Sequence, residues 1–65
     1  MKITYYANAN AAYIYLSDAR IEETGETNYG LIVDLDSERR VVGIEILGVR
    51  DFFSAKALEQ FERIG

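Results

Sequence analysis

Histidine, cysteine, proline and tryptophan are all absent from this chain of 65 residues. The lack of cysteine excludes a disulfide and a thiolate metal site, and the lack of histidine removes the commonest general base and metal ligand. Three serines remain as nucleophiles, but no activating partner can be identified for Ser17, Ser37 or Ser54. The sequence therefore predicts a protein that is not an enzyme and that holds neither a metal nor another cofactor.

Basic charge and long apolar runs are also scarce. The formal net charge of −4 repels phosphate backbones, which argues against nucleic acid as a ligand. No run approaches the roughly 20 apolar residues of a membrane span, and no signal-peptide pattern opens the chain. We therefore expect a cytoplasmic protein without membrane contacts. The acidic charge would suit a basic protein partner, although many soluble proteins are mildly acidic.

The short length limits the size of the hydrophobic core. A chain of 65 residues predicts a single domain, residues 1–65, whose core is marginal. Domains of this size usually need a disulfide, a metal or self-association for stability.

Most of the valine and isoleucine residues lie in 30–49, and they predict a central β-hairpin with arms at 31–35 and 40–49. If Leu35 lies opposite Arg40, apolar residues of the two arms meet on one face of the sheet. That face then carries Leu31, Val33, Val42, Ile44 and Ile46. The loop is then 36–39, and because loops of this kind commonly end in a left-handed residue, Arg39 is predicted to have a positive φ angle.

The residues before the hairpin predict three further strands. Residues 2–6 and 11–16 are rich in aromatic and β-branched residues, and the polar stretch 21–27 predicts a weak edge strand. A helix is the competing interpretation of residues 9–16. Residues 7–10 predict a turn because asparagine tolerates the left-handed conformation, and residues 28–30 predict the turn into the hairpin.

After the hairpin, the spacing of the apolar residues changes from the alternation of a strand to the spacing of an amphipathic helix. Ser54 is suited to the N-cap of a C-terminal helix over 54–64, with Leu58 and Phe61 as its buried anchors. So short a helix does not persist alone in water, so it must dock on the sheet or on a partner. The predicted fold class is α+β: a mainly antiparallel β-meander of four or five strands over 1–49, followed by one C-terminal α-helix.

Carboxylates are the remaining candidates for chemistry. Asp34 and Glu45 could share a sheet face as an acid–base pair, although a solvated face is the simpler interpretation. Four carboxylates match the ligand spacing of a calcium-binding loop: Asp34, Asp36, Glu38 and Glu45. However, Arg39 occupies the position that needs glycine in such a loop, and Glu45 lies roughly 20 Å beyond the turn at the rise of a strand. We therefore expect no calcium loop here.

Three stretches of the chain, 5–16, 33–36 and 40–47, resemble the domain of unknown function 2283 family of small bacterial and archaeal proteins. In the first stretch the resemblance is carried by Ala11, Tyr13, Ile14 and Leu16. It covers roughly residues 1–50, leaves the C-terminal helix outside, and implies a fold but no activity. A toxin–antitoxin role has been suspected for such genes. The chain departs from the family in its first turn, which is commonly acidic there, and at Arg39, where the family usually has glycine.

The second face of the predicted sheet is the candidate interface. It is expected to present Tyr13, Tyr15, Ile32, Val41 and Leu47. Because exposed tyrosines and apolar patches mark contact surfaces, we expect self-association, most simply as a two-fold dimer. Exchange of the C-terminal helix between subunits is a second route. The competing interpretation is that Tyr13 and Tyr15 cover this face within one chain.

These observations predict a protein-interaction module, with an antitoxin-like accessory subunit as its most specific form. The alternatives are a self-associating structural protein and a small-ligand or metal binder or enzyme of unknown reaction. The absence of histidine and cysteine argues against the last class.

Overall fold

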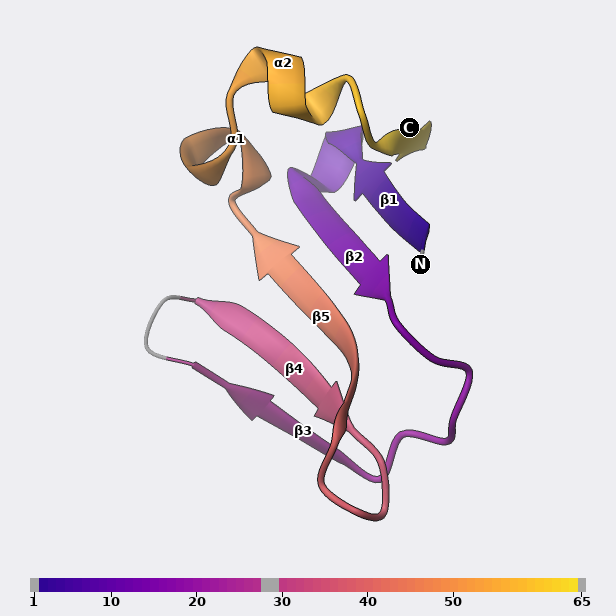
Figure 1. Cartoon of the computed structure of the whole chain (residues 1–65). Coiled ribbons are helices and arrows are strands. Elements are labelled where there is room, and N and C mark those ends of the chain that lie inside the picture. The colour runs from indigo at the N-terminus through magenta and orange to yellow at the C-terminus, as the bar shows by residue number, and fades with distance from the viewer. Residues whose placement is uncertain (1, 28–29, 65) are drawn as a thin grey trace.

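A computed structural model describes residues 2–27 and 30–64, which form one sheet with two short helices over one end (Figure 1). The elements in chain order are β1 (Lys2–Tyr6), the 3-10 turn η1 (Ala7–Ala9), β2 (Ala11–Tyr15), β3 (Glu23–Glu26), β4 (Leu31–Leu35), β5 (Val41–Leu47), α1 (Val49–Phe52), α2 (Ala55–Leu58) and β6 (Glu62–Ile64). The strand order is β3-β4-β5-β2-β1-β6. All neighbouring strands are antiparallel except β1 and β6, which are parallel.

The predicted α+β class and its antiparallel strands are confirmed. The chain makes the β1–β2 hairpin, crosses to β3 at the far edge, and returns through β4 to β5, which pairs with β2. The weak strand predicted at 21–27 is the edge strand β3. Of the turn predicted at 28–30, residues 28 and 29 lie outside the described residues.

The register predicted for the central hairpin is wrong by two residues, but the predicted faces are right except at Val41. Val33 lies opposite Ile44, and the register shifts between Asp34 and Leu35, where Leu35 lies opposite Val41. A two-residue slip leaves every side chain on its original face because the side-chain period of a strand is two. The buried side chains of Val42 and Ile46 are consistent with the predicted inner face.

The hairpin loop begins one residue later than predicted, because Asp36 still pairs with Arg40 across the two strands. The backbone N–H of Asp36 donates to the carbonyl of Arg40 at 2.9 Å, and its carboxylate accepts the backbone N–H groups of Glu38 and Arg40. The loop proper is therefore 37–39, a three-residue loop whose last residue is left-handed. Arg39 has φ 63°, as predicted.

The core lies on the inner face of the sheet, beneath the two helices. Its buried residues are Tyr5, Ala7, Ala12, Ile46 and Val49, and the half-buried side chains packed against them include Leu58 and Phe61. These last two are the anchors predicted for the C-terminal segment. The core is small, because each helix has four residues.

The single helix predicted over 54–64 is wrong. Ser54 is the N-cap, as predicted, and its hydroxyl accepts the N–H of Ala57 at 3.1 Å, but α2 ends at Leu58. The chain then turns and adds β6 to the edge of β1. A helix of about ten residues is marginal in water. The edge of β1 that faces away from β2 instead offers backbone hydrogen bonds to residues 62–64. Among residues 2–27 and 30–64, no helix is long and apolar enough to cross a membrane.

Asn10 ties the first turn of the chain to the start of α1. It is left-handed, with φ 52° and ψ 43°, as the turn prediction anticipated for an asparagine. Its carbonyl accepts the N–H groups of Gly48 and Val49 at 2.9 and 3.0 Å, and its Oδ1 accepts the N–H of Arg50 at 2.9 Å. One residue therefore receives three consecutive N–H groups where the chain leaves β5.

Replacing Arg39 with glycine should leave stability unchanged or raise it by up to about 1 kcal/mol, because the left-handed conformation strains a residue with a Cβ atom. The ion pair of Arg39 with Glu23, at 3.7 Å on the surface, is worth little. Urea unfolding of Arg39→Gly measures the change. Arg40→Gly is the matched control, since Arg40 has no positive φ, and it should lose about 0.5–1 kcal/mol. An equal loss of unfolding free energy in the two variants would contradict backbone strain at Arg39.

Candidate functional site

The side of the sheet that faces away from the helices is called the outer face here. Cross-strand pairing defines it: Tyr13 lies opposite Glu45, which lies opposite Ile32, and Tyr15 lies opposite Gly43. The half-buried residues packed against the core come from the inner face and the helical segment. In the described part of the chain, no helix packs on the outer face.

Tyr13 crosses this face from β2 to β4. Its hydroxyl donates a hydrogen bond to Oδ2 of Asp34, passing over Gly43 on the intervening strand β5. A Cβ atom at Gly43 would lie 2.6 Å from Cζ of Tyr13 and closer still to its hydroxyl oxygen. From the other side, the hydroxyl of Thr24 on β3 donates to Oδ1 of Asp34 at 2.7 Å. This polar bridge thus spans four strands: its hydrogen bonds link β2, β4 and β3, and it passes over β5.

The environment of Tyr13 keeps its hydroxyl protonated. Partial burial, the hydrogen bond to Asp34 and the negative charge of that carboxylate raise the pKa of Tyr13 to about 12, with smaller effects from Tyr15 and Glu45. Because the neutral phenol is the form that donates a hydrogen bond, the bridge persists at neutral pH. A phenol of this pKa is a poor general base, so the bridge is better suited to positioning than to proton transfer.

Two more tyrosines extend the bridge toward β1. The rings of Tyr13 and Tyr15 meet edge to face with their centroids 4.4 Å apart. The hydroxyls of Tyr15 and Tyr6 lie 3.5 Å apart. The outer face therefore has an aromatic half over β1 and β2 and a polar bridge that reaches β3.

The structure places four of the five residues of the predicted interface on the outer face. Tyr15 and Leu47 are 42% and 49% exposed, whereas Tyr13 and Ile32 are half-buried. The bridge of Tyr13 also matches part of the competing interpretation, in which the ring covers the sheet within one chain. Val41 is also exposed. However, the register irregularity places it opposite Leu35, so it does not share the alternation that puts the other four residues on the outer face.

Asp34 and Glu45 share the outer face, as the pattern predicted. Asp34 is occupied by two hydroxyl donors, while Glu45 lies opposite Tyr13 and Ile32. Sequence reasoning missed the roles of Gly43 and Thr24, and the glycine inside a β-branched run was the available signal. Among the side chains described, those of residues 2–27 and 30–61, no group of three or more acidic residues is placed to hold a metal ion.

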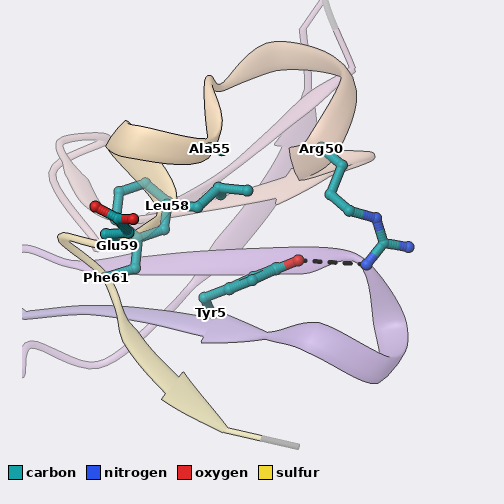
Figure 2. Close-up of a pocket in the computed structure, with 6 residues that line it drawn as sticks. All are labelled: Tyr5, Arg50, Ala55, Leu58, Glu59 and Phe61. Atoms are coloured by element: carbon teal, nitrogen blue, oxygen red, sulfur yellow. Dashed lines mark hydrogen bonds between the residues drawn. The ribbon is translucent and has the colours of Figure 1, made fainter.

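A separate pocket opens on the inner side, between β1 and α2 (Figure 2). It encloses about 460 Å³ and is lined by Tyr5, Arg50, Ala55, Leu58, Glu59 and Phe61. Figure 2 shows the ring of Tyr5 below Leu58, with Arg50 at one end and Phe61 and Glu59 at the other. The guanidinium of Arg50 donates through NH1 to the Tyr5 hydroxyl and to the Ala7 carbonyl, both at 3.3 Å.

Comparison with known proteins identifies a family but no characterised relative. The family model described as "Protein of unknown function (DUF2283)" matches residues 2–50. No curated protein and no solved structure matches the chain. The match includes all of the outer-face bridge, whereas α2, which roofs the pocket, lies beyond it.

Gly43→Ala should destabilise the protein by about 1–3 kcal/mol, as overpacking commonly does, because the new methyl group collides with the Tyr13 ring. In a Tyr13→Ala background the same substitution should cost much less. A double-mutant cycle by urea unfolding measures the difference. Additive effects would show that the two residues do not meet across β5.

Raising the pH should remove stability that Tyr13 contributes. Because its pKa is raised to about 12 in the folded chain, the native state holds this proton more tightly than the unfolded state, in which the pKa is about 10. The contribution is complete below about pH 10 and disappears toward pH 12. Tyr13→Phe should lack both this part of the fall in unfolding free energy and the tyrosinate absorbance change near pH 12. An identical absorbance titration in wild type and variant would contradict the assignment.

Proposed function

The chain belongs to the family of proteins of unknown function DUF2283, and we propose that it is a protein-interaction module that binds through the outer face of its sheet. The observation that supports this is that no second layer covers that face in the described part of the chain. Stable domains bury a sheet against another layer, and here both helices pack on the inner face only. A partner that supplies the layer would complete the fold.

The chemistry of the outer face fits protein binding. Tyr15 and Leu47 are its exposed apolar side chains. They lie on the same face as the half-buried side chains of Tyr13 and Ile32. Tyrosine and apolar residues are favoured at interfaces because they contribute area at a low cost in side-chain entropy. The hydrogen bonds from Tyr13 and Thr24 keep the Asp34 carboxylate paired when this face is covered.

A second copy of this chain is the partner that we propose first. Two identical outer faces can meet about a two-fold axis, which is the commonest closed symmetry. Such a dimer would be a sandwich of two sheets with the helices outside. It would also relieve the marginal core expected of a chain of 65 residues.

A basic protein is the second partner class, in the manner of an antitoxin-like accessory subunit. The net charge of −4 favours it, and so do the carboxylates of Glu26 and Glu45, which the register places on the outer face. In this proposal the protein is cytoplasmic and acts by binding, without catalysis. Its association would weaken with salt, unlike that of an apolar homodimer.

Light scattering of the wild-type protein at micromolar concentration tests the proposal. We expect the mass of a dimer, and we expect Leu47→Lys to give a folded monomer. Ile21→Lys is the matched control, since Ile21 is also 49% exposed but lies before β3, and it should remain dimeric. Circular dichroism checks that both variants are folded.

The other outcomes are also informative. A monomeric wild type that binds a basic protein, with binding lost in Leu47→Lys and reduced by salt, would favour the second partner class. A monomeric wild type whose binding of basic partners is unaffected by Leu47→Lys would rule out the outer face as the interface.

A further inference from the structure

The pocket in Figure 2 is not used by the proposed interface, because it lies on the helical side of the sheet. Its volume of about 460 Å³ falls in the range of roughly 300–1,000 Å³ that small-molecule sites occupy. The floor is rigid, because Tyr5 is a buried core residue on β1. The roof is the short helix α2, whose N-terminus is held by the Ser54 cap.

The walls of the pocket are mainly apolar. The Tyr5 ring, Leu58 and Phe61 are among the lining residues, and the Phe61 ring makes an edge-to-face contact with Phe53, with centroids 5.3 Å apart. A slot between an aromatic floor and an aliphatic roof favours a flat or extended apolar group. The ligand body is therefore expected to be a hydrocarbon or an aromatic ring.

The two ends of the pocket differ in charge. Arg50 provides a guanidinium at one end, and Glu59 provides a carboxylate at the other (Figure 2). Within the described part of the chain no ion pair joins them, and the hydrogen bonds of the guanidinium are made by NH1 alone. Nε and NH2 therefore keep donors for another acceptor. Arginine presents such donors in the geometry that suits a carboxylate.

The position of Arg50 is built into the fold. Its backbone N–H is held by Oδ1 of Asn10, and its NH1 group is held by Tyr5 and Ala7. Two groups from the first hairpin thus hold the guanidinium at the rim, and a third holds the backbone of the same residue. A preorganised cation loses less entropy on binding than a mobile surface side chain does.

We propose that this pocket binds a small monocarboxylate with an apolar body. The carboxylate pairs with Arg50 at the rim, and the body lies between the Tyr5 ring and Leu58, directed toward Phe61. Glu59 at the far end repels a second negative charge, which disfavours dicarboxylates. The same asymmetry disfavours phosphorylated ligands, because Arg50 is the single cation among the described residues that line the pocket.

Three probes that share one body test the charge requirement: 3-phenylpropionate, 3-phenylpropanol and 3-phenylpropylamine. Each is titrated into the nitrogen-15-labelled full chain and followed by amide chemical shifts. We expect saturable shifts from 3-phenylpropionate, centred on the residues that line the pocket. The alcohol should bind at least about tenfold more weakly, since a charge-assisted hydrogen bond is worth about 1.5 kcal/mol or more, and the amine should bind more weakly still.

Two substitutions of equal charge locate the cation. Arg50→Gln should reduce the affinity for 3-phenylpropionate to that for the alcohol, whereas Arg40→Gln, at an exposed position on the hairpin, should leave it unchanged. Arg50→Lys keeps the charge without the planar fork and should give an intermediate affinity. It also serves as the test if Arg50→Gln does not fold. Leu58→Ala should weaken all three probes together by opening the roof.

The result that would overturn the proposal is equal affinity for the carboxylate and the alcohol, because the pocket would then be an apolar cleft without anion recognition. An equal loss of affinity in Arg40→Gln and Arg50→Gln would reduce the effect to overall charge. The absence of saturable shifts with all three probes would exclude the site. Because Leu47→Lys lies on the other face, it should not change 3-phenylpropionate binding, so this site and the interface succeed or fail independently.

Discussion

The three N–H groups that converge on Asn10 are the constraint on which the inner face depends. They come from Gly48, Val49 and Arg50, so the chain must turn over the sheet as soon as β5 ends. This turn places Val49 in the core, where it is fully buried with Tyr5 among its neighbours. It also brings Arg50 to the rim of the pocket. Asn10 can supply a carbonyl and a side-chain oxygen together because asparagine tolerates the left-handed conformation.

The outer face depends on the absence of a side chain at Gly43. That absence lets the Tyr13 ring lie across β5 and reach Asp34, which would otherwise be a carboxylate on a largely aromatic and apolar surface. The hydroxyl of Thr24 completes its hydrogen bonding from the edge strand. The Asp34 carboxylate is thus hydrogen-bonded within the sheet, while Tyr15 and Leu47 stay exposed. A surface with these properties can be covered by another protein while the Asp34 carboxylate stays hydrogen-bonded.

The family match covers the five strands β1 to β5 and ends inside α1. Residues 2–50 include the bridge, Asn10 and Arg50, while α2 and β6 come from the following residues. The floor and the charged rim of the pocket therefore belong to the family region, and its roof belongs to the C-terminal segment. An outer-face interface needs only the family region. The two proposed surfaces consequently differ in how much of the chain they require.

The sequence by itself determined the local elements of this protein, because each depends on neighbouring residues. The strands follow from β-branched and aromatic alternation, the N-cap from Ser54, and the positive φ of Arg39 from the loop that it ends. Tertiary structure decided what depends on distant partners. The hairpin register could slip by two residues without changing either face, so the pattern alone could not choose it. The open edge of β1 converted the end of the expected helix into β6, and the placement of β5 between β4 and β2 created the Tyr13–Asp34 bridge over Gly43. No local pattern contains that strand order, because it is set by which edges and faces remain to be covered once the hairpins have formed.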